Sequence, residues 1–145
     1  MLKKSFLSLS IVLILVVAAS AQKIYTPEKD SAERKAILNA LRVSVEKELK
    51  QKVSFNIDVF NVQGAWAFLS GEPRNAAGTD KPNYRRTIYQ KAIDDDMFDN
   101  NFFAVLKKSG AKWTVITYAI GCTDVCYATW ADDYKAPKAI FPYTE

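Results

Sequence analysis

Aspartates, glutamates, tyrosines or lysines must carry any acid–base chemistry in this sequence, because it contains no histidine. Without imidazole there is no Ser-His-Asp or Cys-His catalysis and no histidine-ligated metal. A carboxylate in an apolar pocket can donate a proton near neutral pH, and a tyrosine can donate to a developing oxyanion. The candidates are Asp124, which lies near Tyr118 and Tyr127 along the chain, and Asp58 on a predicted strand. Each aspartate also has an ordinary structural role, Asp124 as a helix cap and Asp58 as an exposed strand residue.

Cys122 and Cys126 form a C-x3-C pair. A metal site would need two more soft ligands, and the usual redox motif has C-x2-C spacing. Residues four apart on a helix have Cα atoms about 6 Å apart, which a disulfide can bridge. We therefore predict a disulfide across the first turn of the last helix, with two buried free thiols as the alternative.

The densest group of carboxylates contains Asp94, Asp96 and Asp99, which makes them the calcium candidates, because calcium prefers oxygen ligands. The glycine-containing pattern of an EF-hand is absent, and adjacent aspartates are typical of a solvated loop. We therefore expect no metal and no cofactor.

The first 21 residues have the three parts of a secretory signal peptide: Lys3 and Lys4, an apolar run over residues 6–17, and a small-residue cleavage site at residues 19–21. The apolar run is shorter than the roughly 20 residues that span a membrane. We expect cleavage before Gln22 and a periplasmic or secreted product that is not attached to the membrane.

Removal of Lys3 and Lys4 lowers the formal net charge from +4 to +2. A nearly balanced chain gives no reason to expect nucleic-acid binding, which requires an extended basic face. Residues 22–145 are long enough for one domain with its own core.

Hydrophobic periodicity predicts a helix that starts at an Asp30 N-cap, with Glu33 completing a capping box. Residues 53–59 then alternate as a strand, and the alternation slips at Val59-Phe60 as in a β-bulge. A turn at Gln63-Gly64 leads to a predicted strand over 65–69, and residues 71–83 are predicted to form a loop. The predicted apolar stripe of the helix consists of Ile37, Leu38, Leu41, Val45 and Leu49, with Ala40 beside it.

The second half of the chain contains another hairpin, over 101–108 and 112–120, with Trp113 and Val115 on the opposite face from Tyr118 and Ile120. Residues 84–98 fit a short helix or a strand leading into one. Thr123 or Asp124 can cap a last helix that runs to residue 134. The predicted fold is α+β: a curved antiparallel sheet of about four strands on a long N-terminal helix, with a short C-terminal helix.

The order of elements resembles the cystatin-like and nuclear-transport-factor-2-like folds, and the chain resembles an uncharacterised family of secreted bacterial proteins. The family resemblance implies a compartment and a domain extent but no activity. It rests on residues 33–42, 64–69, 112–115, 119–121 and 123–125.

We therefore expect a monomeric or weakly dimeric exported domain that acts by binding a small molecule or a protein partner rather than by catalysis. One alternative is a ligand-sequestering protein or enzyme with an Asp/Tyr pocket in the concave sheet. The other is a cystatin-like protease inhibitor, for which the Gln63-Gly64 turn is the candidate wedge.

Overall fold

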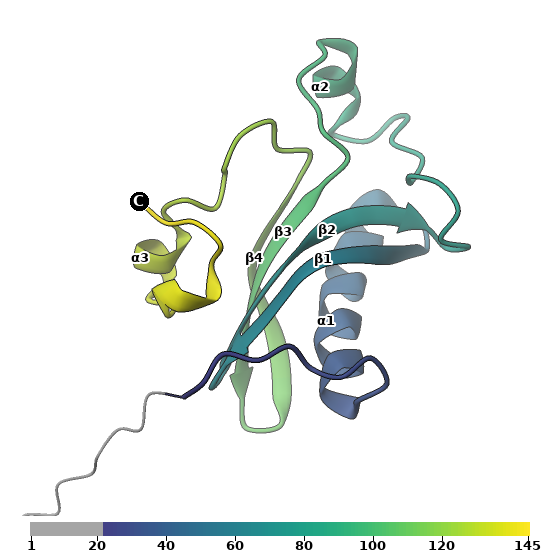
Figure 1. Ribbon diagram of the computed structural model, residues 1–145. Coiled ribbons are helices and arrows are strands. Elements are labelled where there is room, and N and C mark those ends of the chain that lie inside the picture. Colours follow the sequence, from purple (N-terminus) through teal and green to yellow (C-terminus); the bar gives the residue numbers. More distant parts are fainter. Residues whose placement is uncertain (1–21) are drawn as a thin grey trace, which may run out of the picture.

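The computed structural model describes residues 22–145, so the predicted signal peptide lies outside the described residues (Figure 1). It is an α+β protein with one antiparallel sheet of four strands, as predicted. None of the helices in the described part is long and apolar enough to cross a membrane. In chain order the elements are α1 (Ala32–Leu49), β1 (Val53–Gln63), β2 (Trp66–Asn75), α2 (Gln90–Asp94), β3 (Phe102–Ser109), β4 (Lys112–Ile120), α3 (Trp130–Tyr134) and the 3-10 helix η1 (Lys138–Ile140).

The helix α1 begins one residue later than predicted, because Ser31 and not Asp30 is the N-cap. Ser31 has extended backbone angles, and its hydroxyl oxygen accepts a hydrogen bond from the Arg34 amide at 3.1 Å. This bond satisfies one of the free amides of the first turn. The helix ends at Leu49, and its C-cap Lys50 adopts a left-handed conformation. Leu38 of the predicted apolar stripe is only partly buried, and the other members are buried: Ile37, Leu41, Val45 and Leu49.

The strands follow one another in the order β1-β2-β3-β4, so β1 and β4 are the edges. Strand β2 is longer than predicted, since residues 71–75 continue the pairing with β1 instead of opening a loop. Pro73 is compatible with this strand because β2 pairs with β3 only as far as Gly71, which leaves one side of Pro73 without a strand neighbour.

Each edge strand contains one β-bulge. In β1 the bulged residue is Asp58, one position before the predicted slip. In β4 it is Ile116, which the sequence did not reveal. A bulge shifts the alternation of side chains by one residue. Trp113 and Tyr118 therefore lie on the same face of the sheet, and the prediction that they lie on opposite faces was wrong.

The two faces of the sheet have different covers, which Figure 1 shows on opposite sides of the strands. On one face, α1 packs its aliphatic stripe against β4 and β1, over a core that also contains Phe60, Phe102 and Trp113. On the other face lies the tail, which we define as residues 121–145. The tail buries mainly aromatic side chains between itself and the strands: Phe68, Tyr127, Trp130 and Phe141.

The helix predicted from Thr123 or Asp124 to residue 134 is shorter, because α3 begins only at Trp130. Residues 122–129 form turns, so neither predicted cap was correct. Asn101 holds the start of the tail: its side chain donates to the Cys122 carbonyl at 2.7 Å and accepts from the Cys122 amide at 3.0 Å. These bonds engage the backbone groups of Cys122 at the point where a helix would have begun.

Candidate functional site

Glu48 lies in the last turn of α1, and its carboxylate accepts hydrogen bonds from two tyrosines of other elements. Tyr118 of β4 donates to Oε2 at 2.5 Å. Tyr89, just before α2, donates to Oε1. Both carboxylate oxygens are therefore engaged, in hydrogen bonds of the charge-assisted kind. Three segments that are far apart in the sequence meet at this carboxylate.

The bulge at Ile116 places Tyr118 at this point. Residues 113 and 115 face α1, and uninterrupted alternation would place residue 117 on that face and residue 118 on the other. Because Ile116 is unpaired between Val115 and Thr117, Tyr118 turns toward α1 instead. A local irregularity in an edge strand thus creates half of the Glu48 hydrogen-bond arrangement.

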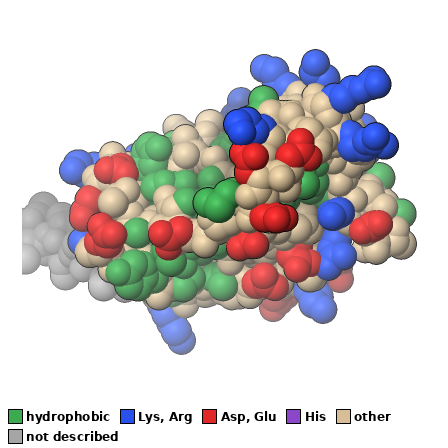
Figure 2. Space-filling view, turned by 90° about the horizontal axis from the view of Figure 1, so that it is seen from above, with side chains coloured by type: hydrophobic (Ala, Val, Ile, Leu, Met, Phe, Trp, Pro, Cys, Tyr) green, Lys and Arg blue, Asp and Glu red, His purple; other side chains and the backbone are tan. Residues whose placement is uncertain are grey.

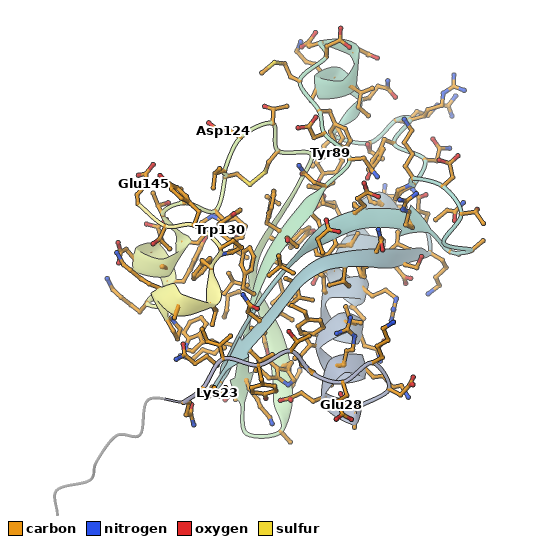
Figure 3. The ribbon with its side chains drawn as sticks, in the orientation of Figure 1. Lys23, Glu28, Tyr89, Asp124, Trp130 and Glu145 are labelled. Carbon is orange, nitrogen blue, oxygen red and sulfur yellow. A yellow bond between two sulfur atoms is a disulfide. The ribbon has the colours of Figure 1, made fainter. Side chains whose placement is uncertain are left out.

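Tyr89 is held by an aromatic cluster at the end of the sheet (Figure 3). Its ring centroid lies 5.9 Å from that of Tyr84 and 5.7 Å from that of Phe98. Tyr84 is itself fixed, since its hydroxyl donates to Asn100 at 2.8 Å. The packing restricts the Tyr89 ring and directs its hydroxyl to Glu48.

Burial raises the pKa of Tyr89 above its ordinary value of 10.0, and the hydrogen bond to Glu48 raises it further. The same two causes, in the same order, raise the pKa of Tyr118. A raised pKa means that both hydroxyl groups keep their protons and continue to donate near neutral pH. These tyrosines act here as hydrogen-bond donors and not as bases.

A hollow of about 420 Å³ opens beside Glu48. We call it the cationic hollow, because none of the ion pairs within residues 22–145 involves Lys50, Arg85 or Arg86. All three side chains are exposed. The single carboxylate of the hollow is occupied by the two tyrosines. The residues that line the hollow are Glu48, Leu49, Lys50, Arg85, Arg86, Thr87 and Ile88.

Two cations of this hollow sit on strained backbone. Lys50 has φ 53° and Arg86 has φ 62°, both in the left-handed region. This conformation is unfavourable by roughly 1–2 kcal/mol for a residue with a side chain, and glycine is the usual choice after a helix. Strained residues tend to gather at functional sites, where the surrounding structure holds them.

Gln51 fixes the loop that carries the two arginines. Its side-chain amide donates to the Asn83 carbonyl at 2.8 Å and accepts from the Asn83 amide at 2.9 Å. Thr87 closes the following turn by donating to the Tyr84 carbonyl at 2.6 Å. The cationic hollow is thus formed by a loop that is tied to the end of α1.

A second hollow, of about 450 Å³, adjoins the first through Arg85, which lines both. We call it the polar hollow, because most of its lining side chains carry charged or amide groups. They are Asp80, Lys81, Asn83, Arg85 and Gln90, beside Pro82, Tyr84 and Ile93. In Figure 2, Lys and Arg side chains gather along one side of this end of the molecule, while acidic side chains lie nearer the centre of the view.

The structure does not assemble the carboxylate–tyrosine group that the sequence pointed to. Asp124 is exposed on the loop between β4 and α3 (Figure 3) and accepts a bond from the Val125 amide at 2.6 Å. Tyr127 belongs to the tail and is buried against the sheet, on the opposite face from Tyr118. Asp58 is exposed at the bulge of β1.

Cys122 and Cys126 are joined by a disulfide with a Cα–Cα distance of 6.2 Å. The bond lies in the turns that precede α3 rather than in the first turn of the helix. It closes a small loop at the point where the chain leaves β4.

The calcium candidates Asp94, Asp96 and Asp99 are exposed around the C-terminal end of α2. No group of three or more Cys, Asp or Glu side chains in residues 22–145 is arranged to hold a metal ion. The neighbouring Asp95 instead pairs with Lys91 at 2.6 Å.

Sequence reasoning missed Glu48, the residue at the centre of this site. The available signal is its spacing: it follows Leu41 by seven residues and Val45 by three, which places it on the flank of the buried stripe. A glutamate at such a position needs a partner, and buried tyrosines are suitable donors. No pattern in the sequence marks Arg85 and Arg86 as site residues, because their position beside Glu48 depends on how the loop returns to α1.

Comparisons with known proteins give no indication of function, so the function has to be inferred from the geometry of the site. No family model matches the chain, and no curated protein or solved structure matches it significantly.

Proposed function

We propose that the protein is an exported binding domain that holds an anionic ligand in the cationic hollow. The observation that carries this proposal is the set of three exposed cations, Lys50, Arg85 and Arg86, around a carboxylate whose two oxygens are already engaged. Arginine pairs bind carboxylates and phosphates well, since their planar groups donate in matching geometry.

The two tyrosines favour this function by keeping Glu48 occupied. A free carboxylate in the hollow would pair with an arginine and compete with an anionic ligand. Because Tyr89 and Tyr118 donate to both of its oxygens, the carboxylate has less to gain from such a pair. The arginines are thus left for an external anion.

Binding has more support than catalysis. Both faces of the sheet are packed, one by α1 and the other by the tail. The tyrosines of the site have a raised pKa and do not act as bases, and Glu48 is not free to accept a proton from a substrate. An Asp/Tyr enzyme pocket is less well supported, because Asp58 and Asp124 are both exposed.

The proposal includes an exported, monomeric or weakly dimeric domain over residues 22–145, released by cleavage of a signal peptide. The cystatin-like or nuclear-transport-factor-2-like layout, with a sheet curved around a long helix, is part of it. Curvature is supported by the contacts of α1 with both edge strands and by a bulge in each of those strands.

The test is a titration of the labelled protein with glucuronate, citrate and inorganic phosphate, followed by NMR. We expect the amide signals of Lys50 and Thr87 to shift. Replacing both arginines, as Arg85→Gln with Arg86→Gln, should weaken binding about tenfold or more, the equivalent of losing one charge-assisted bond. Lys112→Gln, at an exposed position in the second hairpin, is the matched control. No shift with any of the three anions would refute the proposal.

A second candidate, protease inhibition, has one specific observation in its favour. The N-terminal segment and both hairpin turns lie at the same end of the molecule (Figure 1). Gln63 donates to the Gln22 carbonyl at 2.7 Å, and the Lys108 amide donates to the Ala65 carbonyl at 2.7 Å. Three neighbouring segments of this kind form a wedge that can enter a cleft.

Inhibition of a papain-type cysteine protease tests this second candidate. The wild type should slow hydrolysis of a peptide substrate, and Ala65→Glu at the exposed first turn should abolish the effect. Ala139→Glu, at an exposed position in η1 of the tail, is the control. Unchanged protease activity in the presence of excess wild-type protein would rule the candidate out.

A further inference from the structure

The polar hollow has the lining expected of a site for a hydroxylated ligand. Part of this polar lining is already engaged: one Asp80 oxygen accepts from the Lys81 amide, Asn83 Oδ1 accepts from the Arg85 amide, and Gln90 Nε2 donates to Asp94. The second Asp80 oxygen, the Asn83 side-chain nitrogen and the Gln90 side-chain oxygen have no hydrogen bond within residues 22–145, so they offer acceptors and a donor. Ile93, which is partly exposed, adds apolar surface. Sugars present this combination of hydroxyl groups and apolar C–H faces, whereas a simple anion has no use for it.

The two hollows adjoin at Arg85, which lines both of them. A ligand long enough to span them meets Lys50, Arg85 and Arg86 at one end and, at the other, two side-chain amides with the oppositely charged Asp80 and Lys81. The charge of the lining thus changes from strongly positive to nearly balanced along the path. The complementary ligand has an acidic unit followed by a neutral, hydroxyl-rich unit.

We propose that the ligand is an acidic oligosaccharide, with a uronate in the cationic hollow and a neutral sugar in the polar hollow. This inference rests on the proposed function, since it names the class of ligand that the same site takes. Arg85, shared by the two hollows, binds the uronate carboxylate from the side of the glycosidic linkage.

The lining argues against an acidic peptide and against a nucleic acid. A polyglutamate chain carries a charge on every residue, whereas the polar hollow offers Asp80 and Lys81 with opposite charges and therefore little net attraction for a second carboxylate. Single-stranded nucleic acid binds on exposed aromatic rings. Among the residues that line these hollows, Ile88 is a large hydrophobic residue with an exposed side chain, but it is aliphatic and offers no ring for a base. The ring of Tyr84 is buried.

The experiment measures binding of four probes to the full mature chain by calorimetry. These are free glucuronate, a hexasaccharide of alternating uronate and N-acetylhexosamine, a neutral chitin hexasaccharide and hexaglutamate. The acidic hexasaccharide should bind about tenfold more tightly than free glucuronate, because it fills both hollows. The neutral sugar and the peptide should bind more weakly than the acidic hexasaccharide.

Variants of the polar hollow separate this inference from the proposed function. Asp80→Ala and Gln90→Ala should remove the advantage of the hexasaccharide without weakening the binding of free glucuronate. Lys91→Ala is the control, since Lys91 lies beside Gln90 but lines neither hollow. Their NMR spectra show whether each variant is folded.

Each other outcome is decisive. If glucuronate binds and the hexasaccharide binds no more tightly, the oligosaccharide inference fails and the anion site remains. If hexaglutamate or the neutral sugar binds as tightly as the acidic hexasaccharide, the inference also fails. If neither acidic sugar binds, the proposed function fails together with the inference.

Discussion

The two faces of the sheet are covered in different ways, and the candidate site lies at the edge of only one of them. The α1 face is covered by a regular helix with an aliphatic stripe that fills the interface. The tail face is covered by turns, a five-residue helix and a 3-10 turn, which pack through aromatic rings.

The consequence of this difference is seen where each cover ends. A straight helix ends abruptly, and the loop that returns across its end leaves the two hollows around Glu48, Lys50 and Arg85. The tail is irregular and follows the strands, with Asn61 donating to the Ile140 carbonyl at 2.8 Å. In this protein, the regular element leaves hollows at its end, while the irregular one closes the surface.

The largest expected effect tests whether the tail packs as a separate unit. Phe68 is fully buried, with its ring centroid 5.0 Å from that of Tyr127 and 5.1 Å from that of Phe141. Phe68→Ala should lower the free energy of unfolding by about 3–5 kcal/mol and, in addition, expose the tail to trypsin at Lys135.

Leu41→Ala is the matched change on the α1 face, where Leu41 is also fully buried, and should cost about 2–5 kcal/mol. Its tail should stay resistant to trypsin under conditions in which the protein is folded. Equal cleavage of the two variants would mean that the tail and α1 open together.

The next effect concerns the disulfide, which belongs to the tail alone. Replacing both cysteines, as Cys122→Ser with Cys126→Ser, should lower the free energy of unfolding by about 2 kcal/mol, because the closed loop is short. Denaturant unfolding measures this loss. A fully unfolded double variant would show that the aromatic packing of the tail depends on the bond.

Alkaline pH tests the α1 face through the tyrosines at Glu48, and the comparison needs a variant of these residues because burial also raises the pKa of Tyr127 on the tail face. Burial and Glu48 raise the pKa of Tyr89 and Tyr118 above 10.0, so the folded protein keeps protons that the unfolded chain loses. The stabilisation by these protons is complete below pH 10 and declines as the pH rises above it. The free energy of unfolding of the wild type should therefore fall above pH 10.

The double variant Tyr89→Phe with Tyr118→Phe should show a shallower decline above pH 10. At neutral pH it should be less stable by about 1.5 kcal/mol, the lower end for hydrogen bonds to a charged group, since the residues are partly exposed. Tyr143→Phe, at an exposed position, is the control. Identical pH profiles for wild type and double variant would contradict the role given to Glu48.

The smallest effect tests the strain at the cationic hollow. Lys50→Gly should raise the free energy of unfolding by about 1 kcal/mol, because glycine adopts a φ of 53° without strain. It should also weaken anion binding. Lys47→Gly, inside α1, should instead lower stability by about 1 kcal/mol. Destabilisation by both changes would show that Lys50 contributes contacts worth more than its strain.

The sequence predicts well the elements whose hydrophobic pattern and turn residues lie within one short segment. The α1 stripe has helical spacing, and the hairpin over β3 and β4 has a turn at Ser109-Gly110 between two apolar runs. The tail could not be predicted in the same way, because its aromatic residues are ordered by contacts with β2 and β3 rather than by their neighbours in sequence.

The site was less predictable than the fold, for a physical reason that Tyr118 illustrates. Strand β4 is apolar at residues 113, 115, 116 and 120, so its sequence does not show where the alternation changes. The bulge at Ile116 is defined by pairing with β3, and only that pairing turns Tyr118 toward Glu48. Of the acid–base candidates from the sequence, Tyr118 alone belongs to the Glu48 cluster.

The bulges at Asp58 and Ile116 have a consequence for a chain that we propose to be exported. They lie in β1 and β4, the two strands whose outer backbone groups have no strand neighbour. A regular edge of this kind is a template on which another chain can add a strand and start aggregation. Each bulge interrupts that template, and the Tyr25 bridge to Val62 covers part of the β1 edge. The same irregularity that turns Tyr118 toward Glu48 therefore also makes the β4 edge a poorer template for an added strand.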